Sequence, residues 1–413
     1  MDMTKRTEFH REGTLLLVLC VPQAFRDGRL FFEQQACNGL QMWSTFFSKV
    51  VVATPLVEMQ KAEKSVVWKP VDSILAYDRI EFVQLPQAFH PMEFFKVAAK
   101  TCDRLRHLID QADYLQFVVG GLFGDFGSLA AKQARDLNRK YAVHMDWVCH
   151  RVLRENARGF SWKNLCKRIL YRLTGFWNNW QIRHANLVLC HGKTVYDYYK
   201  KINPRSFLIH NVHTKEKDWI DGQVLEEKKA HAMTSPFVSI CYFGQMIEMK
   251  APMDWLKALA YARDLGANFK ATWYGDGPLF RAFVAMKEKL GLENSVASPG
   301  WVVDRRSLLQ NIETFDVFLM THISDESPRS VIEALVKGMA VVGYESAYAR
   351  EIMSGACLQK RGDWKALGKT IANLCSNRAW LTQMIEESAV VGRRFSDEKV
   401  FSERALLIKR HLR

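Results

Sequence analysis

The feature that most constrains the fold is a series of short apolar runs, rich in β-branched residues and separated by longer segments with helical periodicity. These runs lack the alternation of a half-exposed strand, so the sheets they form must be buried on both faces. Apolar strands that alternate with helices predict an α/β fold with parallel sheets covered by helices. The predicted strands are Leu15–Val21, Val50–Ala53, Leu115–Val119, Ala142–His144, Leu187–Cys190 and Phe207–Ile209, then Val238–Phe243, Ala271–Tyr274, Phe315–Met320 and Ala340–Val342.

The chain is long enough for two domains: it has 413 residues, 48% of them hydrophobic. A polar, charged stretch between the two sets of strands predicts a connection. We expect an N-terminal domain over 1–212, a linker over 213–235 and a second domain over 236–394. The segment 395–413 is expected to cross back to the first domain. Ligands of parallel sheets bind beyond the carboxyl ends of the strands, so two such sheets facing each other predict a cleft.

The N-terminus resembles a signal peptide only superficially. Lys5, Arg6 and Arg11 precede the apolar run Leu15–Val21, but the run is short and Pro22 follows it in place of a small-residue cleavage site. We interpret the run as a buried strand and expect a cytoplasmic protein, since no apolar stretch is long enough to span a bilayer. The nine cysteines include no CxxC pair, which indicates neither a disulfide framework nor a zinc site.

The most informative segment runs from Phe315 to Tyr344. A buried strand leads through a polar turn into a helix with Ser327 at the N-cap and Pro328 in the first turn, and Gly338 ends the helix. The backbone N–H groups of a first helical turn form an anion site suited to a diphosphate. Asp325 precedes the helix and Glu333 lies on it, where carboxylates can accept hydrogen bonds from sugar and ribose hydroxyls.

The stretch Asp325–Leu335 resembles the acidic-x7-Glu motif of retaining glycosyltransferases with the GT-B fold, particularly glycosyltransferase family 4. Three further segments agree in order and spacing with that family. They are Tyr242-Phe243-Gly244 with Lys250 six residues later, Tyr274-Gly275-Asp276-Gly277-Pro278-Leu279, and Pro299-Gly300-Trp301. The resemblance covers about 110 residues of the second half, and it implies two Rossmann-like domains with parallel sheets facing across a cleft.

The resemblance also implies roles for individual residues. Glu333 would bind the donor ribose, Asp325 would contact the transferred sugar, and Lys250 would neutralise the diphosphate leaving group without an obligatory metal or cofactor. The residues it assigns to donor binding are Gly244, Gln245, Lys250, Gly275, Gly277, Trp301, Glu326, Ser327, Arg329, Ser330 and Glu333.

Two positions depart from the family pattern. The family usually has arginine directly after the strand-end glycine, where this chain has Gln245, and Arg329 is our candidate to supply the missing cation. The first acidic position holds Asp325 in place of the usual glutamate, and Glu326 beside it is an alternative. Simpler interpretations stay open as well: Glu333 could pair with Lys337 four residues on, and Lys250 could be a solvated lysine.

In the first half, His144 ends a predicted strand. The resemblance makes it a candidate active-site histidine that contacts the donor sugar, and a purely structural histidine is the alternative. The glycine-rich segment Gly120–Gly127 is not a dinucleotide fingerprint and is read as a tight structural turn. His191-Gly192-Lys193 ends another strand and is a weaker candidate for the cleft.

Half of the net charge of +14 lies in residues 151–183, which hold eight basic residues and one acidic residue. Tryptophan and aliphatic residues recur there at helical spacing. A basic helix with an apolar face is typical of a surface that lies on an anionic membrane, and a helix packed on its own domain is the alternative. No nucleic-acid motif accompanies the charge, so a nucleic-acid partner is not expected.

We therefore expect a retaining hexosyltransferase, peripheral on the inner face of the cell membrane. It would use a UDP- or GDP-sugar and a glycan or lipid-linked glycan acceptor, in surface polysaccharide biosynthesis. Two alternatives remain. A GT-B nucleotide-sugar epimerase would use the same donor pocket, and Gln245 is compatible with a non-catalytic nucleotide-sugar-binding or scaffold subunit.

Overall fold

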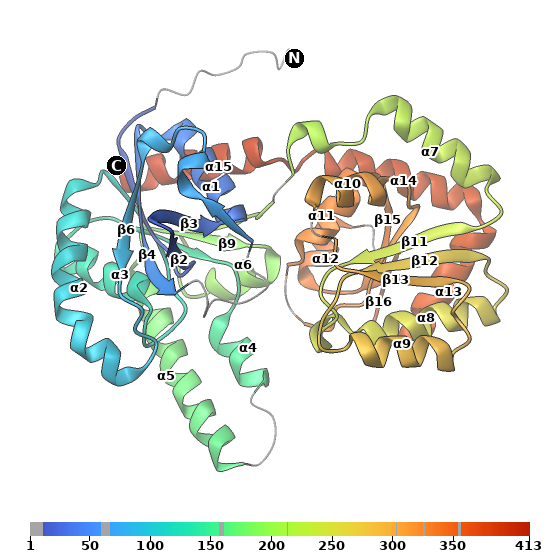
Figure 1. Ribbon diagram of the computed structural model, residues 1–413, viewed down its shortest axis with the longest axis horizontal. Coiled ribbons are helices and arrows are strands. Elements are labelled where there is room, and N and C mark those ends of the chain that lie inside the picture. Colours follow the sequence, from blue (N-terminus) through green and yellow to red (C-terminus); the bar gives the residue numbers. More distant parts are fainter. Residues whose placement is uncertain are drawn as a thin grey trace. The chain divides into compact units, whose positions relative to one another are not determined.

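The computed structural model describes residues 11–58, 67–156, 161–212, 214–302, 304–324, 327–353 and 357–413 (Figure 1). The chain divides into two compact units. The first comprises the residues up to 210 together with 400–413, and the second comprises 211–399. Each unit is an α/β structure built on a sheet with parallel strands, which confirms the expected fold class.

The first unit is built on parallel strands in the order β6-β4-β1-β7-β8-β9-β10. The central strand β1 alternates between two cores, because Leu16 and Val18 contribute to one face and Leu15 and Leu17 to the other. This double burial explains the continuous apolar runs. The strands are β1 (Thr14–Val18), β4 (Lys49–Glu58), β6 (Ile80–Leu85), β7 (Tyr114–Val118), β8 (Ala142–Met145), β9 (Leu187–His191) and β10 (Ser206–Ile209).

An antiparallel extension, which the sequence analysis did not predict, lies at the far end of β4. Strand β2 (Gln23–Arg26) pairs with β4 and with β3 (Arg29–Glu33), and β3 pairs with β5 (Trp68–Pro70). The buried Gln23 amide donates to the carbonyls of Thr54 and Val83 at 2.9 and 3.0 Å. This side chain therefore links the extension to the parallel strands β4 and β6.

Helices cover both faces of the first sheet. On one face lie α1 (Gln34–Phe46) and the C-terminal helix α15 (Asp397–Leu412), where the rings of Trp43 and Phe401 meet edge to face at 5.0 Å. On the other face lie α2 (Pro91–Gln111), α3 (Phe126–Asp136), the end of α5 (Trp162–His184) and α6 (Lys193–Tyr199). Helix α15 begins within the second unit, and its residues from Val400 belong to the first.

The second sheet is parallel throughout, in the order β13-β12-β11-β14-β15-β16. The chain enters at β11, adds β12 and β13 on one side, and then crosses to β14 on the other. This reversal between β11 and β14 is the topological switch point, where ligands of such sheets bind. The strands are β11 (Val238–Phe243), β12 (Phe269–Tyr274), β13 (Val296–Gly300), β14 (Val317–Met320), β15 (Ala340–Tyr344) and β16 (Leu358–Gln359).

Most of the segment 213–235, predicted as a linker, is helical: α7 (Gly222–Thr234) is part of the second unit. It packs against α14 (Arg378–Gly392), where Lys229 pairs with Glu386 at 3.0 Å. The other helices of the unit are α8 (Pro252–Asp264), α9 (Phe280–Lys289), α10 (Arg305–Glu313), α11 (Arg329–Val336), α12 (Ala347–Ile352) and α13 (Trp364–Ser376). Within the described part of the chain, no helix combines the length and apolarity needed to cross a bilayer.

Candidate active site

The predicted donor-binding residues of the second unit gather at the carboxyl edge of its sheet. Gly244 follows β11, Gly275 follows β12, Trp301 follows β13, and α11 begins after β14. Because the sheet is parallel, all four strands end at this edge. The prediction that these motifs lie at strand ends is confirmed, whereas the role of each residue stays a prediction.

The backbones of Gly244 and Gly275 are in direct contact, which leaves no room for a side chain on Gly275. Both have φ values that L-residues rarely adopt, +148° and +151°. A β-carbon on Gly275 would lie 2.0 Å from the carbonyl oxygen of Gly244, so only glycine fits there. The Gly244 N–H donates to the Tyr274 carbonyl at 2.8 Å, and the Trp273 indole donates to the Gly244 carbonyl at 3.0 Å. These contacts hold the two glycine turns together.

The Lys250 side chain points toward the glycine turn at Gly244. A β-carbon on Gly244 would lie 3.0 Å from Nζ of Lys250, so the ammonium is next to the exposed backbone of the glycine turn. The lysine ends a short 3-10 helix, Glu248–Lys250. Its carbonyl accepts a hydrogen bond from the Thr321 hydroxyl at 2.8 Å, which fastens the loop after β11 to the loop after β14. The cation is thereby held at the switch point.

The loops after β12 and β13 extend the same edge. The Met246 N–H donates to the Asp276 carbonyl at 2.9 Å, and the Gly275 N–H donates to the Gly300 carbonyl at 2.8 Å. Gly277 lies against the Met246 backbone. Gln245 and Trp301 are both exposed. The turns quoted in the sequence analysis therefore form a continuous, hydrogen-bonded rim with two accessible side chains.

Helix α11 starts one residue later than predicted. Pro328 is the N-cap, with the extended backbone angle ψ of 122°, and Arg329 is the first helical residue, so Ser327 precedes the cap. Ser327 and Ser330 are half-buried and Arg329 is exposed. Asp325 and Glu326 lie outside the described residues.

Glu333 is almost fully buried on α11, with 8% of its surface exposed. The alternative interpretation paired it with Lys337 on a solvated helix face. Lys337 instead forms an ion pair with Glu313 and is itself buried. A surface pair therefore does not account for Glu333, and a buried carboxylate about one helical turn into α11 suits a role in binding hydroxyl groups.

The sequence analysis missed a buried polar pair at the same edge. The Tyr242 hydroxyl, on β11, and Nε2 of His322, just after β14, are 2.5 Å apart, and both side chains are buried. Polar groups in such surroundings require partners, and this pair bridges the two strands of the switch point. A histidine two residues beyond a predicted strand end was the available signal.

In the first unit, His144 lies at the carboxyl end of β8 and is almost fully buried. Nη2 of Arg404, on α15, lies 3.0 Å from its Nδ1, and Asp146 lies 3.4 Å from its Nε2. Burial lowers the pKa of His144; Asp146 acts in the opposite direction, and Arg404 adds to the lowering. The imidazole is therefore held neutral, a state in which it can both donate and accept hydrogen bonds.

The glycine-rich segment of the first unit is a structural turn, as the sequence analysis proposed. The Asp125 carboxylate accepts hydrogen bonds from the N–H groups of Gly120, Gly121 and Ser128 at 2.8 to 3.1 Å and caps α3. Within the other weak candidate segment, Gly192 begins α6 and Lys193 pairs with Asp197 at 2.7 Å.

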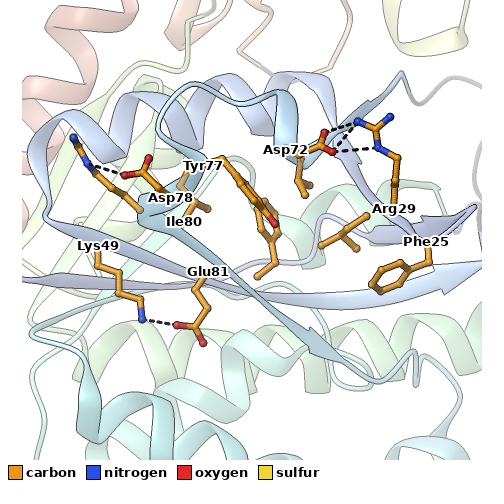
Figure 2. A pocket seen from close by; sticks show the side chains of 13 residues that line it. Phe25, Arg29, Lys49, Asp72, Tyr77, Asp78, Ile80 and Glu81 are labelled. Carbon is orange, nitrogen blue, oxygen red and sulfur yellow. Dashed lines mark hydrogen bonds and ion pairs between the residues drawn. The ribbon is translucent and has the colours of Figure 1, made fainter.

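A pocket of about 650 Å³ lies at the opposite, amino edge of the first sheet (Figure 2). Lys49 and Ile80, the first residues of β4 and β6, line it. Its charged side chains pair with one another: Arg29 binds Asp72 at 2.7 Å, and Lys49 binds Glu81 at 2.5 Å. The pocket includes no predicted site residue and is separate from the edge that carries them.

Among the described residues, no group of three or more histidine, cysteine, aspartate or glutamate side chains is placed to hold a metal ion.

The second unit is similar to a known protein family. Residues 224–390 match the family described as Glycosyl transferases group 1. EpsF of Bacillus subtilis (strain 168), whose name assigns it provisionally to the glycosyltransferases, is 24% identical over 199 residues. That alignment covers 47% of this chain and 50% of EpsF, so the chain spans about half the length of this relative. The resemblance drawn from the motifs is confirmed at the level of a group 1 glycosyltransferase domain.

Solved structures match over nearly the whole chain. Alr3699/HepE from Anabaena, in complex with UDP, has a TM-score of 0.67 at 16% identity and covers 96% of this chain and 100% of its own. WaaG, a glycosyltransferase involved in lipopolysaccharide biosynthesis, has a TM-score of 0.61 at 14% identity, covering 95% and 99%. A glycosyltransferase from Rickettsia africae has a TM-score of 0.65 at 12% identity, covering 98% and 100%. These similarities establish the GT-B fold.

Proposed function

We propose that the protein is a retaining glycosyltransferase that moves a hexose from a UDP- or GDP-sugar to a glycan or lipid-linked glycan in surface polysaccharide biosynthesis. The observation that carries this proposal is the position of Lys250, whose ammonium lies against the Gly244 backbone at the switch point of the second sheet. The group 1 glycosyltransferase match over the same unit supports it.

In this reaction the acceptor oxygen replaces a diphosphate oxygen at the anomeric carbon of the sugar, and the acceptor proton passes to the departing diphosphate. Negative charge therefore grows on the diphosphate as its bond to the sugar breaks. The Lys250 cation and the first-turn N–H groups of α11 would stabilise that charge. In this proposal these groups would supply the stabilisation of the leaving group, so no metal ion would be obligatory.

The remaining donor-site residues would hold the nucleotide. The buried Glu333 carboxylate would accept hydrogen bonds from the ribose hydroxyls, and Trp301 would lie beside the base. Asp325 would contact the transferred sugar, with Glu326 as its alternative. The HepE structures hold UDP, UDP with glucose, or UDP-glucose, which favours a UDP-sugar for this chain.

His144 would contact the transferred sugar from the first unit. Both ring nitrogens have neighbours in the structure, Arg404 at Nδ1 and Asp146 at Nε2, so a sugar hydroxyl would replace one of these contacts. Burial and Arg404 favour the neutral form. This assignment comes from the family resemblance, and the buried position at the carboxyl end of β8 supports it.

A non-catalytic nucleotide-sugar-binding subunit is the second candidate, and Gln245 favours it. Its exposed amide stands where the family usually has a second phosphate cation, so the diphosphate would lose part of its stabilisation. Arg329, exposed in the first turn of α11, is our candidate for the compensating cation. Donor binding without turnover would favour this non-catalytic subunit. Turnover that appears in Gln245→Arg would instead identify a weakened enzyme. Release of an altered sugar in the absence of acceptor would indicate an epimerase.

The acceptor chemistry points to a peripheral location on the inner face of the membrane. WaaG, which shares the fold, acts in lipopolysaccharide biosynthesis, and residues 151–183 of this chain contain eight basic residues against one acidic residue. A lipid-linked acceptor would be reached there by a protein that binds the membrane without spanning it.

The donor site is tested by thermal-shift titration with UDP-, GDP- and ADP-sugars. A true donor raises the melting temperature as its concentration passes the dissociation constant. We expect one nucleotide class to do so, and we expect Glu333→Gln and Lys250→Met to lose at least tenfold in affinity. Glu293→Gln and Lys289→Met, at exposed positions of the same unit, are the matched controls. Equal affinity in the test and control variants would show that the donor site is elsewhere.

A further inference from the structure

Helix α5 exposes apolar residues and buries polar ones, which is the reverse of an ordinary surface helix. Trp162, Leu165, Ile169, Leu173 and Phe176 recur every three or four residues and are all exposed, with 78% of Trp162 and 74% of Phe176 accessible. This spacing places them on one face of the helix. Soluble proteins rarely expose a contiguous apolar stripe of this kind unless a partner covers it.

The opposite face of the same helix is polar and buried. Thr174, Asn178 and Gln181 follow at spacings of four and three residues, and all three are buried against the first unit. Gly175 packs so closely on His150, in α4 (Cys149–Asn156), that a β-carbon would lie 2.8 Å from its ring. The helix is thus seated through a side that carries these polar residues together with Ile182 at its end, and its apolar stripe faces outward.

The charge around the stripe indicates what covers it. Residues 161–184 contain no acidic residue and five cations, Lys163, Lys167, Arg168, Arg172 and Arg183. Lys167 and Arg172 are exposed beside the stripe. Two copies of this chain joined through it would bring these like charges together. An anionic lipid surface instead accepts both the apolar stripe and the cations.

The position of α5 places its apolar stripe near the carboxyl edge of the first sheet. Strands β8 and β9 are parallel, so α5 must return to the amino edge of the sheet to begin β9. A helix of 23 residues is roughly 34 Å long, whereas the five residues of β9 span roughly 17 Å. The excess length therefore projects past the carboxyl edge, where His144 lies, and Figure 1 shows α5 extending beyond the other helices of the unit.

We propose that α5 is a membrane-docking helix: its stripe Trp162–Phe176 inserts into an anionic lipid surface and holds the carboxyl edge of the first sheet beside that surface. This inference rests on the peripheral location proposed above and extends it to the acceptor, which would be lipid-linked and taken from the membrane plane. The bound helix lies along the interface, with its cations at the level of the lipid headgroups.

The test is co-sedimentation of the full chain with phosphatidylcholine vesicles, with and without one third phosphatidylglycerol. We expect binding to the anionic vesicles only, weakening as salt is added. Leu165→Ser/Leu173→Ser is expected to reduce the partition coefficient at least tenfold. Leu75→Ser/Leu406→Ser, which removes two exposed leucines elsewhere in the first unit, is the matched control and should bind as the wild type does.

The electrostatic contribution is tested by Lys167→Glu/Arg172→Glu, which is also expected to lose at least tenfold in partitioning. Arg281→Glu/Lys289→Glu, on the exposed face of α9, makes the same change in net charge and should retain binding. Equal binding to neutral and anionic vesicles, unchanged binding in the α5 variants, or self-association of the wild type through α5 would overturn the proposal.

Donor titration of the same variants separates this inference from the transfer reaction. We expect the α5 variants to keep the wild-type response to the nucleotide sugar, because the residues proposed to hold the nucleotide lie in the second unit and His144 is not part of α5. Vesicle binding by a wild type that binds no nucleotide sugar would leave the docking helix standing and reject the proposed transferase. Donor binding without vesicle binding would reject the docking helix alone.

Discussion

Contacts between single residues far apart in the chain set the geometry of the candidate donor site. Gly244 and Gly275 belong to different strand ends and touch through their backbones. Tyr242 and His322 are 80 positions apart and join β11 to β14. Such contacts bring the loops to a fixed separation, and Lys250 takes its position from them. Substitutions at these residues should therefore alter both stability and donor affinity.

Gly275→Ala is expected to lower the free energy of unfolding by about 3 kcal/mol, because the new methyl group collides with the Gly244 carbonyl and φ is unfavourable. Donor affinity should fall with it, since the two glycine turns separate. Gly266→Ala is the control: φ is +87° there, but no atom lies within 4 Å, so a cost of about 1 kcal/mol is expected. Urea unfolding compares the two, and equal costs would contradict the close contact.

Helices are joined to one another by side chains as well as by apolar packing. Lys228 of α7 is buried, and its ammonium donates to the carbonyls of Glu313 and Lys337 at 3.1 and 2.8 Å, at the ends of α10 and α11. Carbonyls at helix ends lack partners within the helix, so one lysine satisfies two helices. This explains why a charged residue occupies the buried side of α7.

Lys228 should make stability depend on pH. Burial lowers its pKa from 10.5 to about 8. Between these values the unfolded chain binds more protons than the folded chain, so the stability contributed by this residue rises with pH from about 8 to 10.5. Below pH 8 the cost of the buried charge is present in full, about 3 kcal/mol.

The measurement is the free energy of unfolding of wild type and Lys228→Met at pH 7.5 and at pH 10, taken as a difference so that other titrating groups cancel. We expect the wild type to gain stability relative to the variant as the pH rises. Lys229→Met, at the neighbouring half-buried position, is the control: the ion pairs of Lys229 with Glu226 and Glu386 raise its pKa, so it should show no such gain. A difference that stays flat over this range would mean that burial does not lower the pKa of Lys228 and that the residue stays protonated in both the folded and the unfolded chain.

The C-terminal segment of the chain belongs to the first unit, because α15 begins in the second unit and its residues from Val400 complete the core of the first. Phe401, Ala405, Ile408 and Leu412 are all buried against the face that carries α1. Arg404, between them, contacts His144, 260 positions earlier. The last residues of the chain are therefore required for the first core and for the state of the candidate histidine.

Ile408→Ala is expected to destabilise the first unit by about 2 to 4 kcal/mol through loss of burial and the resulting cavity. Leu406→Ala, at an exposed position of the same helix, is the control and should cost less than about 0.5 kcal/mol. Hydrogen exchange read separately on peptides of each unit gives the measurement. Faster exchange confined to the first unit is expected, and equal acceleration in both would show that the units unfold as one.

Several features could be read from the sequence because their physical cause is local. Strands buried on both faces require continuous apolar runs, and all ten predicted runs became strands, β11 with the predicted bounds. Gly244 directly follows the predicted strand Val238–Phe243, and Gly275 directly follows Ala271–Tyr274, so both glycine turns could be located from the strands. The group 1 glycosyltransferase resemblance could be recognised for this reason, since its motifs lie within one continuous stretch of chain.

Other features depended on neighbours that only folding supplies. The polar composition of 213–235 suggested a linker, yet α7 forms because Leu225, Lys228 and Ala232 find a surface to pack on. The short strands β2, β3 and β5 are held by a chain of pairings that starts at β4 rather than by a pattern of their own: β2 pairs with β4, β3 with β2, and β5 with β3. The exposed apolar stripe of α5 and the contact between Arg404 and His144 follow from which helix faces are buried, and the tertiary structure alone decides that.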